Sequence, residues 1–362
     1  MRLLTLFTFL FVFSYGIAQT DTLQLSEDIE IVKALGVDSL GYIDPDVLKS
    51  YNEGVEMLAN AQAQQSIEAF SKAIELKDDF SKAYFNRAVA EKQLGQQEAA
   101  YADFIRFTEL DTIPAEGYFQ AAIIKFESLQ YDEAIELLDM AIRSDNIEAK
   151  YNYQKGLIFF LMADYDIAIE EYTIALQKRP NNAYALNDRA SCKKEKGDLQ
   201  GAIYDYNKAV TANPEFAISW NNLGSALRDY ESYDESIEAY SNAIMYEPEN
   251  EIYINNRGYT YFLKAEYSSA MSDFDLATSI NENYAFAYSN KSATLIKMQE
   301  YTDAITEASY AIEINPQYGY AYLNRGIAKE MIRDKKGACE DWIKAEELGV
   351  QSASAHLSNT CN

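Results

Sequence analysis

The sequence predicts an all-α fold, a solenoid of stacked helix hairpins without a sheet. Three observations predict it. The triplet Asn-Arg-Gly begins at Asn256 and again at Asn324, 68 residues or twice 34 later. Small residues return at fixed places within a 34-residue repeat. The 362 residues are 48% hydrophobic but include only 15 Gly and 6 Pro, few breakers for a chain of this size. A fixed period of this length is typical of repeat architectures.

The repeat can be placed along the chain without insertions. Positions 8, 20 and 27 are small in 26 of 27 cases, and Phe107 is the exception. Small residues let neighbouring helices approach closely. Phe107 needs extra room, which Gly117 and its neighbours are expected to supply, so an irregularity is expected between the second and third repeats. The nine repeats are expected at 47–80, 81–114, 115–148, 149–182, 183–216, 217–250, 251–284, 285–318 and 319–352.

Each repeat contains two helices, here called A and B. Apolar residues at positions 20, 21, 24, 27 and 28 mark one face of helix B, as "YDEAIELLDMAI" (131–142) shows. Short polar turns such as "KGD" (196–198) separate the two helices. Proline at position 32 marks the end of helix B in four repeats, at Pro180, Pro214, Pro248 and Pro316.

These features resemble the tetratricopeptide repeat (TPR) family over residues 47–352. The resemblance rests on the small residues, on large apolar residues at positions 4 and 24, on Tyr at 17 and on Pro at 32. It implies a right-handed TPR solenoid whose A helices line a concave groove, with the B helices outside. The chain departs from the family at position 11, where an aromatic residue is usual but Glu91, Lys125, Lys193 and Lys329 occur.

Positions 7 and 23 vary together. A base at one accompanies an acid at the other, and where position 7 is apolar, at Ala121 and Leu223, position 23 is apolar too. Because the two positions lie at matching heights in an antiparallel hairpin, we expect structural ion pairs rather than a row of ligand-binding arginines. The expected pairs are Arg87–Asp103, Lys155–Glu171, Arg189–Asp205, Arg257–Asp273, Lys291–Glu307 and Arg325–Asp341.

Position 6 carries amide-like side chains in every repeat, although Asn is a poor residue within a helix. The resemblance places this position in the groove, where amides can bond to the backbone of an extended peptide. The alternative is that they satisfy polar groups between repeats. The peptide-binding candidates at this position are Asn86, Gln120, Gln154, Asp188, Asn222, Asn256, Asn290 and Asn324.

The expected groove lining is aromatic in the second to fourth repeats and polar in the fifth and sixth, and aromatics return at Tyr259 and Phe262. Exposed apolar patches of this kind often mark binding surfaces. The alternative is that these rings pack between neighbouring A helices. The candidates in the early repeats are Phe85, Phe119, Phe126, Tyr153 and Phe160.

The N-terminal residues predict export. Residues 1–18 combine Arg2, an apolar run too short for a membrane-spanning helix and small residues before Gln19, as in a cleaved signal peptide. An uncleaved anchor is the alternative. We expect a periplasmic or secreted bacterial protein. Residues 19–46 are expected to form a loosely packed lead segment, or alternatively to occupy the chain's own groove. Asp44 and Pro45 are expected to begin the first helix.

The C-terminal residues 353–362 predict a capping helix over the last apolar face. Cys339 and Cys361 are equidistant from Val350, the expected turn, so a hairpin would bring them to one height. In an oxidising compartment this predicts a disulfide, with two thiols as the alternative. Cys192 is interpreted as an inert core thiol.

Charge and composition exclude several functions. A net charge of −26 argues against nucleic acid as the main ligand and against attraction to anionic lipid. His356 is the one histidine, and phosphate-binding loops and zinc spacings are absent from the sequence. We therefore expect no metal, no cofactor and no enzyme activity.

Two functions fit these observations. The leading hypothesis is an exported scaffold that binds a protein or an extended peptide in the concave groove. The alternative is a structural subunit of an envelope complex that contacts partners through its acidic outer face or its ends. No membrane insertion is expected after signal cleavage, and nothing in the sequence supports a homo-oligomer.

Overall fold

The structure, a computed structural model, describes residues 43–361. This range contains nineteen α-helices and no strand, which confirms the all-α prediction. Helix contacts divide the chain into two units, the first ending at Ile158 and the second beginning at Phe159. Each unit is described by itself. The predicted signal peptide and nearly all of the predicted lead segment lie outside the described residues.

The first unit begins with three hairpins. Asp44 caps the first helix by accepting a hydrogen bond from the Asp46 backbone N–H (2.8 Å), and Pro45 takes the first helical position. The helices are α2 (Pro45–Ala59), α3 (Ala63–Leu76), α4 (Ser81–Gln93), α5 (Gln97–Leu110), α6 (Ala115–Glu127) and α7 (Tyr131–Ser144), and the unit boundary falls within α8 (Ala149–Leu161).

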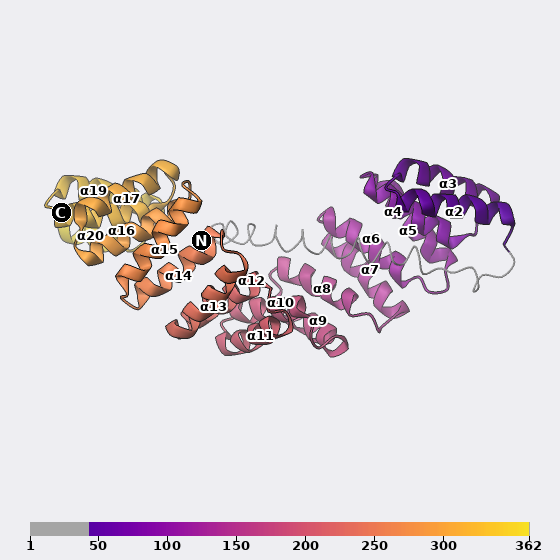
Figure 1. Cartoon of the computed structure of the whole chain (residues 1–362), viewed down its shortest axis with the longest axis horizontal. Helices are drawn as coiled ribbons and strands as arrows, with labels where there is room; N and C mark the ends of the chain where they lie inside the picture. Colours follow the sequence, from indigo (N-terminus) through magenta and orange to yellow (C-terminus); the bar gives the residue numbers. More distant parts are fainter. Residues whose placement is uncertain (1–42, 362) are drawn as a thin grey trace. The chain divides into compact units, whose positions relative to one another are not determined.

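The second unit continues the same alternation of A and B helices and ends with an additional short helix (Figure 1). Its helices are α9 (Tyr165–Lys178), α10 (Ala183–Glu195), α11 (Leu199–Ala212), α12 (Ala217–Asp229), α13 (Tyr233–Tyr246), α14 (Glu251–Leu263), α15 (Tyr267–Ile280), α16 (Ala285–Met298), α17 (Tyr301–Ile314), α18 (Gly319–Met331), α19 (Lys335–Glu347) and α20 (Ala353–Thr360).

Within each unit a helix packs mainly on its neighbours along the chain. Helix α14 contacts α15 in its own hairpin and α13 in the preceding one, and the same holds for α4 with α5 and α3. Consecutive A helices also touch, as α2 with α4 and α16 with α18 show. This nearest-neighbour packing defines a solenoid.

The small residue at position 8 accommodates a ring from helix B of the same hairpin. A Cβ on Gly258 would lie 2.8 Å from the ring of Phe274, and one on Gly326 would lie 2.4 Å from the indole of Trp342. Both rings are fully buried. The hairpin core therefore requires a side chain no larger than this space permits, which explains the small residues in the period.

Phe107, the exception to the small-residue rule, is accommodated as its neighbours suggested. Its ring occupies the space beside Gly117, where a Cβ would come within 2.4 Å of it. It also packs against Phe85, with ring centroids 5.0 Å apart. The small residue expected at position 27 of α5 is thus replaced by Phe107, and the missing side chain of Gly117 in α6 provides the space that this ring needs.

The A–B turns share one backbone feature that the sequence does not display. Position 15 has a positive φ at each described turn, from 57° at Ala61 to 85° at Gly197. Only Gly95, Gly197 and the terminal-turn residue Gly349 meet this conformation with glycine; elsewhere residues such as Leu129 and Glu231 adopt it. The A–B turn therefore keeps the same backbone conformation whichever residue stands at position 15.

The C-terminal helix α20 packs on α19 and closes the last hairpin. A disulfide joins Cys339 and Cys361, whose Cα atoms lie 5.8 Å apart. His356 stacks on the buried indole of Trp342, with ring centroids 4.7 Å apart. The lone histidine of the sequence therefore serves the core of the cap.

Candidate peptide-binding face

Five A helices of the second unit present one continuous surface, here called the A face. Helices α10, α12, α14, α16 and α18 touch in succession, each against the next A helix. Their half-buried and exposed side chains at positions 2, 6, 9, 12 and 13 form this surface. Two features of the A face can bind a partner: a row of amides and a patch of aromatic rings.

The amides form a ladder from one A helix to the next, here called the amide ladder. Each position-6 Nδ2 group donates a hydrogen bond to a residue 35 positions earlier, at position 5 of the preceding repeat. The bonds are Asn222 to Asn187 Oδ1 (3.2 Å), Asn256 to Asn221 Oδ1 (3.0 Å), Asn290 to Asn255 Oδ1 (2.9 Å) and Asn324 to the Ser289 carbonyl (3.0 Å).

The ladder leaves binding capacity on the surface. An amide carries two N–H donors and an oxygen with two lone pairs, and the inter-repeat bond uses one of these. The position-6 side chains of α12, α14, α16 and α18 are half-buried rather than enclosed. Their inter-repeat role, the alternative considered from the sequence, therefore leaves room for a bound backbone.

The aromatic patch lies at the C-terminal end of the A face and consists of Tyr259, Phe286, Tyr318 and Tyr320. Tyr318 is its centre, with its ring centroid 4.8 Å from Phe286 and 6.1 Å from Tyr320. Phe286 is 39% exposed and Tyr320 55% exposed. Large rings that remain this open after packing on one another form an apolar surface available to a partner.

A basic group adjoins this patch. The guanidinium of Arg228 lies 5.6 Å from the ring centroid of Tyr259. Arg228 also donates hydrogen bonds to the Tyr240 hydroxyl (3.2 Å) and to Ser225 (3.3 Å). Burial raises the pKa of Tyr318 to about 12, against a hydrogen bond from Ser289. The Tyr318 phenol is therefore neutral at physiological pH.

The predicted aromatic lining of the early repeats is largely wrong. Phe85 and Phe119 are 4% and 2% exposed, so neither lines an open surface. Phe85 packs on Phe104 (5.3 Å between centroids), and Phe119 packs on Tyr151 (5.4 Å). Phe160 is also buried and lies 5.7 Å from the ring of Tyr165. These rings form the core, as the alternative interpretation allowed.

The predicted amide row also changes character in the early repeats. Asn86 is fully buried and donates to the Tyr51 hydroxyl (2.8 Å), so it cannot meet a peptide. Gln120, which donates to Glu116 (3.1 Å), and Gln154 are buried as well. Asp188 is half-buried and accepts a hydrogen bond from Asn187 (3.0 Å). Only the later members of the row reach the surface.

The remaining lining candidates are half-buried. Phe126 lies against Tyr131 at the start of its own helix B, with centroids 6.0 Å apart. Phe262 lies in the same way against Tyr267 (5.9 Å). Tyr153 is half-buried on α8. A ring at position 12 therefore joins helix A to helix B by packing on the Tyr at position 17.

Five of the six expected ion pairs join residues within one unit, and the structure brings all five together. The four arginines bind their aspartates through two hydrogen bonds each, of 2.6–2.9 Å, and Lys291 lies 2.9 Å from Glu307. The sixth expected pair, Lys155–Glu171, joins residues of different units and stays a prediction; within the first unit Lys155 lies 2.9 Å from Asp139. The five pairs are Arg87–Asp103, Arg189–Asp205, Arg257–Asp273, Arg325–Asp341 and Lys291–Glu307.

Two sets of residues escaped the sequence reasoning. The later position-5 acceptors of the ladder, Asn255 and Ser289, could have been found because they are polar in the repeats that precede a surface amide. The exposed rings Phe286 and Tyr320 both stand at position 2, an expected groove position, and that shared position was the available signal.

The described residues contain neither a metal-ion cluster nor a membrane-spanning helix. Between residues 43 and 361 there is no cluster of three or more histidine, cysteine or acidic side chains suited to a metal ion. Over the same range, every helix is too short or too polar to cross a membrane.

Family models decide what these repeats are. The model of the tetratricopeptide repeat matches residues 153–217 and 195–250, and a second model of the same description matches residues 81–113. The chain carries tetratricopeptide repeats. The TPR resemblance inferred from the sequence is confirmed, and the hairpins within these matched residues are TPR hairpins.

Similar proteins support the same fold. Protein FlbA of Caulobacter vibrioides is 43% identical over 79 residues, which cover 22% of this chain and 12% of FlbA. An uncharacterised protein of Methanocaldococcus jannaschii is 39% identical over 56 residues, which cover 16% of this chain and 65% of that protein. A tetratricopeptide repeat protein from Parabacteroides merdae superposes with a TM-score of 0.56 at 19% identity, covering 68% of this chain and 99% of that one.

TPR proteins typically act as non-catalytic scaffolds in protein–protein interaction, so the matched repeats suggest an interaction role. The matched regions span less than two thirds of both curated relatives. The relatives therefore contribute the repeat and its fold, and the binding surface has to be argued from this chain's own residues.

Proposed function

We propose that the protein is a scaffold that binds an extended peptide segment of a partner protein along the A face of the second unit. The observation that carries this proposal is the open aromatic patch, in which Tyr320 is 55% and Phe286 39% exposed beside the half-buried amide ladder. Rings supply apolar contact area at a low cost in side-chain entropy. Amides bind peptide backbone without regard to its sequence.

Several observations support this surface over the acidic outside. The ladder residues Asn256, Asn290 and Asn324 are already fixed by inter-repeat bonds, so a peptide would meet pre-oriented amides. The tightly paired arginines, such as Arg257, are engaged with Asp273 and supply structure rather than ligand contacts. The patch and the ladder lie on consecutive A helices, so one extended segment can contact both.

We also propose that the protein is exported to an oxidising compartment. The supporting observations are the predicted signal peptide in residues 1–18 and the disulfide between Cys339 and Cys361. Disulfides persist in such compartments and are rare in the cytosol. N-terminal sequencing of the protein recovered from its producing cells tests this proposal: a chain that begins at Gln19 supports cleavage, and an intact Met1 contradicts it.

The binding proposal can be tested by photo-crosslinking in cells that produce the full chain. A benzoylphenylalanine crosslinker is placed at position 320 or 286 on the A face, and at position 204 or 245 on B helices. Tyr204 and Met245 are 58% and 62% exposed, so these control positions are at least as accessible as the A-face positions. We expect covalent adducts with a partner from positions 320 and 286 only.

The substitution Tyr320→Ala provides the second readout, with Tyr204→Ala as its matched control. We expect Tyr320→Ala to abolish partner capture from position 286 while circular dichroism shows unchanged helix content. Adducts that form only from positions 204 and 245 would reject the A face and support the alternative, a structural subunit that binds through its outer surface.

A further inference from the structure

Each of the three B–A turns of the first unit has an exposed apolar side chain in it or next to it. These turns, residues 77–80, 111–114 and 145–148, join each helix B to the next helix A and, with Leu76, are here called the B–A edge. Ile113 is 67% and Ile147 76% exposed, and Leu76, the last residue of α3, is 50% exposed. Both isoleucines stand at position 33, which is polar in every B–A turn of the second unit.

The three turns are neighbours in space. The Ser81 hydroxyl donates a hydrogen bond to Asp111 (2.8 Å), which joins the first turn to the second. Lys150 lies 2.7 Å from Glu116, and this ion pair joins the second turn to the third. Each member of the pair stands three positions after an isoleucine of the edge. The exposed apolar side chains therefore form one row along the first unit, and a row of this kind indicates a binding surface more strongly than a single exposed side chain does.

Hydrogen bonds within the turns fix the backbone at both isoleucines. The Ile113 N–H donates to Asp111 Oδ1 (3.0 Å), and the Ile147 N–H donates to Asp145 Oδ1 (2.9 Å). An aspartate that accepts a bond from the residue two positions later stabilises the turn between them. A side chain on a backbone that is already ordered loses less conformational freedom when it binds a partner.

The B–A edge is negatively charged. Its three turns contain five acids and one base, which gives a net charge of −4. These residues are Asp78, Asp79, Asp111, Asp145, Glu148 and Lys77. The three helix residues on either side of each turn add three acids and three bases, so they leave this value unchanged. The hydrogen bonds that Asp111 and Asp145 accept come from neutral donors and do not cancel their charges.

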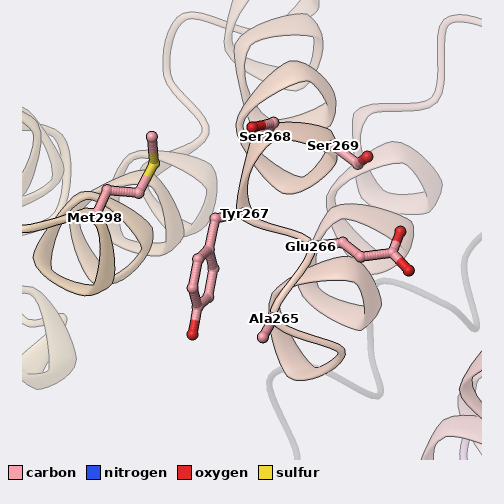
Figure 2. A pocket seen from close by; sticks show the side chains of 6 residues that line it. All are labelled: Ala265, Glu266, Tyr267, Ser268, Ser269 and Met298. Atoms are coloured by element: carbon pink, nitrogen blue, oxygen red, sulfur yellow. The ribbon is translucent and has the colours of Figure 1, made fainter.

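The α14–α15 turn of the second unit differs from this edge in shape and in charge. Figure 2 shows Met298 and Tyr267 at a shallow hollow of about 440 Å³ beside this turn, in place of a row of exposed side chains. Glu266, which also lines the hollow, lies 2.6 Å from Lys264, so its charge is neutralised locally. The hollow therefore indicates no charge for a partner, whereas the B–A edge does.

We propose that the B–A edge docks a basic protein, whose surface receives Ile113 and Ile147 in apolar depressions. Protein interfaces commonly combine an apolar centre with a polar rim, and the charges of the two partners are complementary. A net charge of −4 around two exposed isoleucines matches a partner with lysine or arginine around an apolar site. The proposal is independent of the A face, which lies in the second unit.

Charge argues against the other occupants of this edge. A second copy of the chain carries a net charge of −26. The chain's own residues 19–42, which lie outside the described residues, contain five acids and one base. Nucleic acid and anionic lipid are negative as well. Each of these would bring like charges together at the edge, which weakens association, whereas a basic protein would not.

The test is binding of the purified full chain to labelled synthetic peptides, measured by fluorescence anisotropy. An amphipathic peptide of leucine and lysine combines the two properties that the edge requires. A serine–lysine peptide keeps the charge without the apolar side chains, and a leucine–glutamate peptide reverses the charge. We expect the leucine–lysine peptide to bind most tightly, with an affinity that falls as salt is raised.

Two pairs of substitutions locate this binding on the edge. Ile113→Ser with Ile147→Ser should weaken binding of the leucine–lysine peptide by about 10-fold, because the buried apolar area is lost. Asp111→Asn with Asp145→Asn keeps the oxygen that accepts each turn bond and removes two charges. It should also weaken binding, by about 10-fold, and reduce the salt dependence.

Matched substitutions in the second unit provide the controls. Tyr204→Ser with Met245→Ser removes two exposed apolar side chains from B helices, and Asp303→Asn with Glu313→Gln removes two exposed acids from α17. Circular dichroism checks that every variant keeps its helix content.

Losses in the edge variants alone support the proposal. Equal losses in the controls, or equal affinities for the leucine–lysine and leucine–glutamate peptides, would overturn it. Sedimentation velocity tests the second copy as occupant, and we expect a monomer. A dimer that Ile113→Ser with Ile147→Ser dissociates would also overturn the proposal, because the edge would then serve self-association.

Discussion

Each position-7 arginine links two hairpins through a single guanidinium. Arg257 donates two hydrogen bonds of 2.8 Å to Asp273 in its own hairpin and a third, of 3.0 Å, to Ser241 in helix α13 of the preceding hairpin. Asp273 is 5% exposed, so its charge depends on this pairing. The planar, forked guanidinium explains why arginine rather than lysine accompanies aspartate here.

A double-mutant cycle on Arg257 and Asp273 tests this pairing. Arg257→Ala and Asp273→Ala should each lower the free energy of unfolding by about 3 kcal/mol, because each leaves a largely buried charge without its partner. The double variant should lose much less than the sum. Urea unfolding followed by circular dichroism measures it. The exposed pair Lys344–Glu347 is the control, with a coupling below about 1 kcal/mol expected. Additive losses at Arg257 and Asp273 would contradict the pairing.

The residue at position 11 differs in charge between repeats, although each faces an aspartate at position 23. Lys193 and Lys329 approach the position-23 aspartates Asp205 and Asp341 within 2.7 and 2.8 Å. In the second repeat the residue at this position is Glu91, which is 7% exposed and lies near Asp103. Burial raises the pKa of Glu91 to about 7, the charge of Asp103 adds to the rise, and Arg87 opposes it.

The substitution Glu91→Gln should remove a pH-dependent loss of stability. Because the folded-state pKa of about 7 exceeds the ordinary 4.5, the folded state holds the proton more tightly, and stability falls as pH rises through this window. Above pH 7 the wild type should be less stable than Glu91→Gln by about 2–3 kcal/mol, with little difference below pH 4.5. Urea unfolding across this range measures the difference, and the exposed Glu98→Gln should leave the wild-type slope unchanged. A parallel pH dependence in Glu91→Gln and wild type would reject the assignment.

At the scale of the element, the turn between helices A and B is defined by its backbone rather than by its residue. Ala163 adopts φ +63° and Gly197 adopts φ +85° at equivalent positions of neighbouring repeats. Both are exposed, and a Cβ on Gly197 would meet nothing within 4 Å. Side-chain packing therefore contributes little to the stability difference between Ala and Gly at these two sites. The difference comes from the cost of the left-handed conformation for an L side chain.

Reciprocal substitutions at these turns should change stability in opposite directions. Ala163→Gly should raise the free energy of unfolding by about 0.5–1 kcal/mol, and Gly197→Ala should lower it by about 1 kcal/mol, because an L side chain is strained at positive φ. Thermal or urea unfolding of the two variants measures the changes. If both substitutions moved stability in the same direction, backbone strain would not explain the turn.

For the whole molecule, the period predicts the repeating core but not the depth of each side chain. Small residues at positions 8, 20 and 27 fix which faces meet, and Gly258 beneath Phe274 is one instance. Phe85 and Asn255 occupy the same position 5, yet Phe85 is enclosed by Phe104 and Phe107, while Asn255 accepts a bond from the next A helix. That difference depends on residues of neighbouring repeats.

The candidate site was therefore only partly predictable. Position 6 was identified as a row of amides, and the later half of that row does reach the A face. Within the aromatic patch, Tyr259 was expected, whereas Phe286 and Tyr320 were missed. Both pack on Tyr318, a residue before the helix start whose place no helical period specifies. A periodic argument assigns faces, whereas exposure depends on how the adjoining loops fill the space between repeats.

The disulfide at the C-terminal cap provides a test of nearest-neighbour stability within the second unit. Cys339 and Cys361 enclose a separation of 22 residues, and closing a loop of this length stabilises by about 3 kcal/mol. In a solenoid, removal of the disulfide should destabilise the last hairpins first, because each hairpin contacts only its neighbours.

We expect the double variant Cys339→Ser, Cys361→Ser to exchange backbone hydrogens faster in α18, α19 and α20, with α10 and α11 unchanged, in hydrogen–deuterium exchange measured by mass spectrometry. The single variant Cys192→Ser is the control for cysteine removal at a site away from the cap, since Cys192 is buried in α10. A uniform acceleration across α10 to α20 in the double variant would mean that the second unit unfolds as one cooperative block. The additive picture of its hairpins would then fail, and with it the expectation that the cap can loosen while the amide ladder between α12 and α14 keeps its bonds.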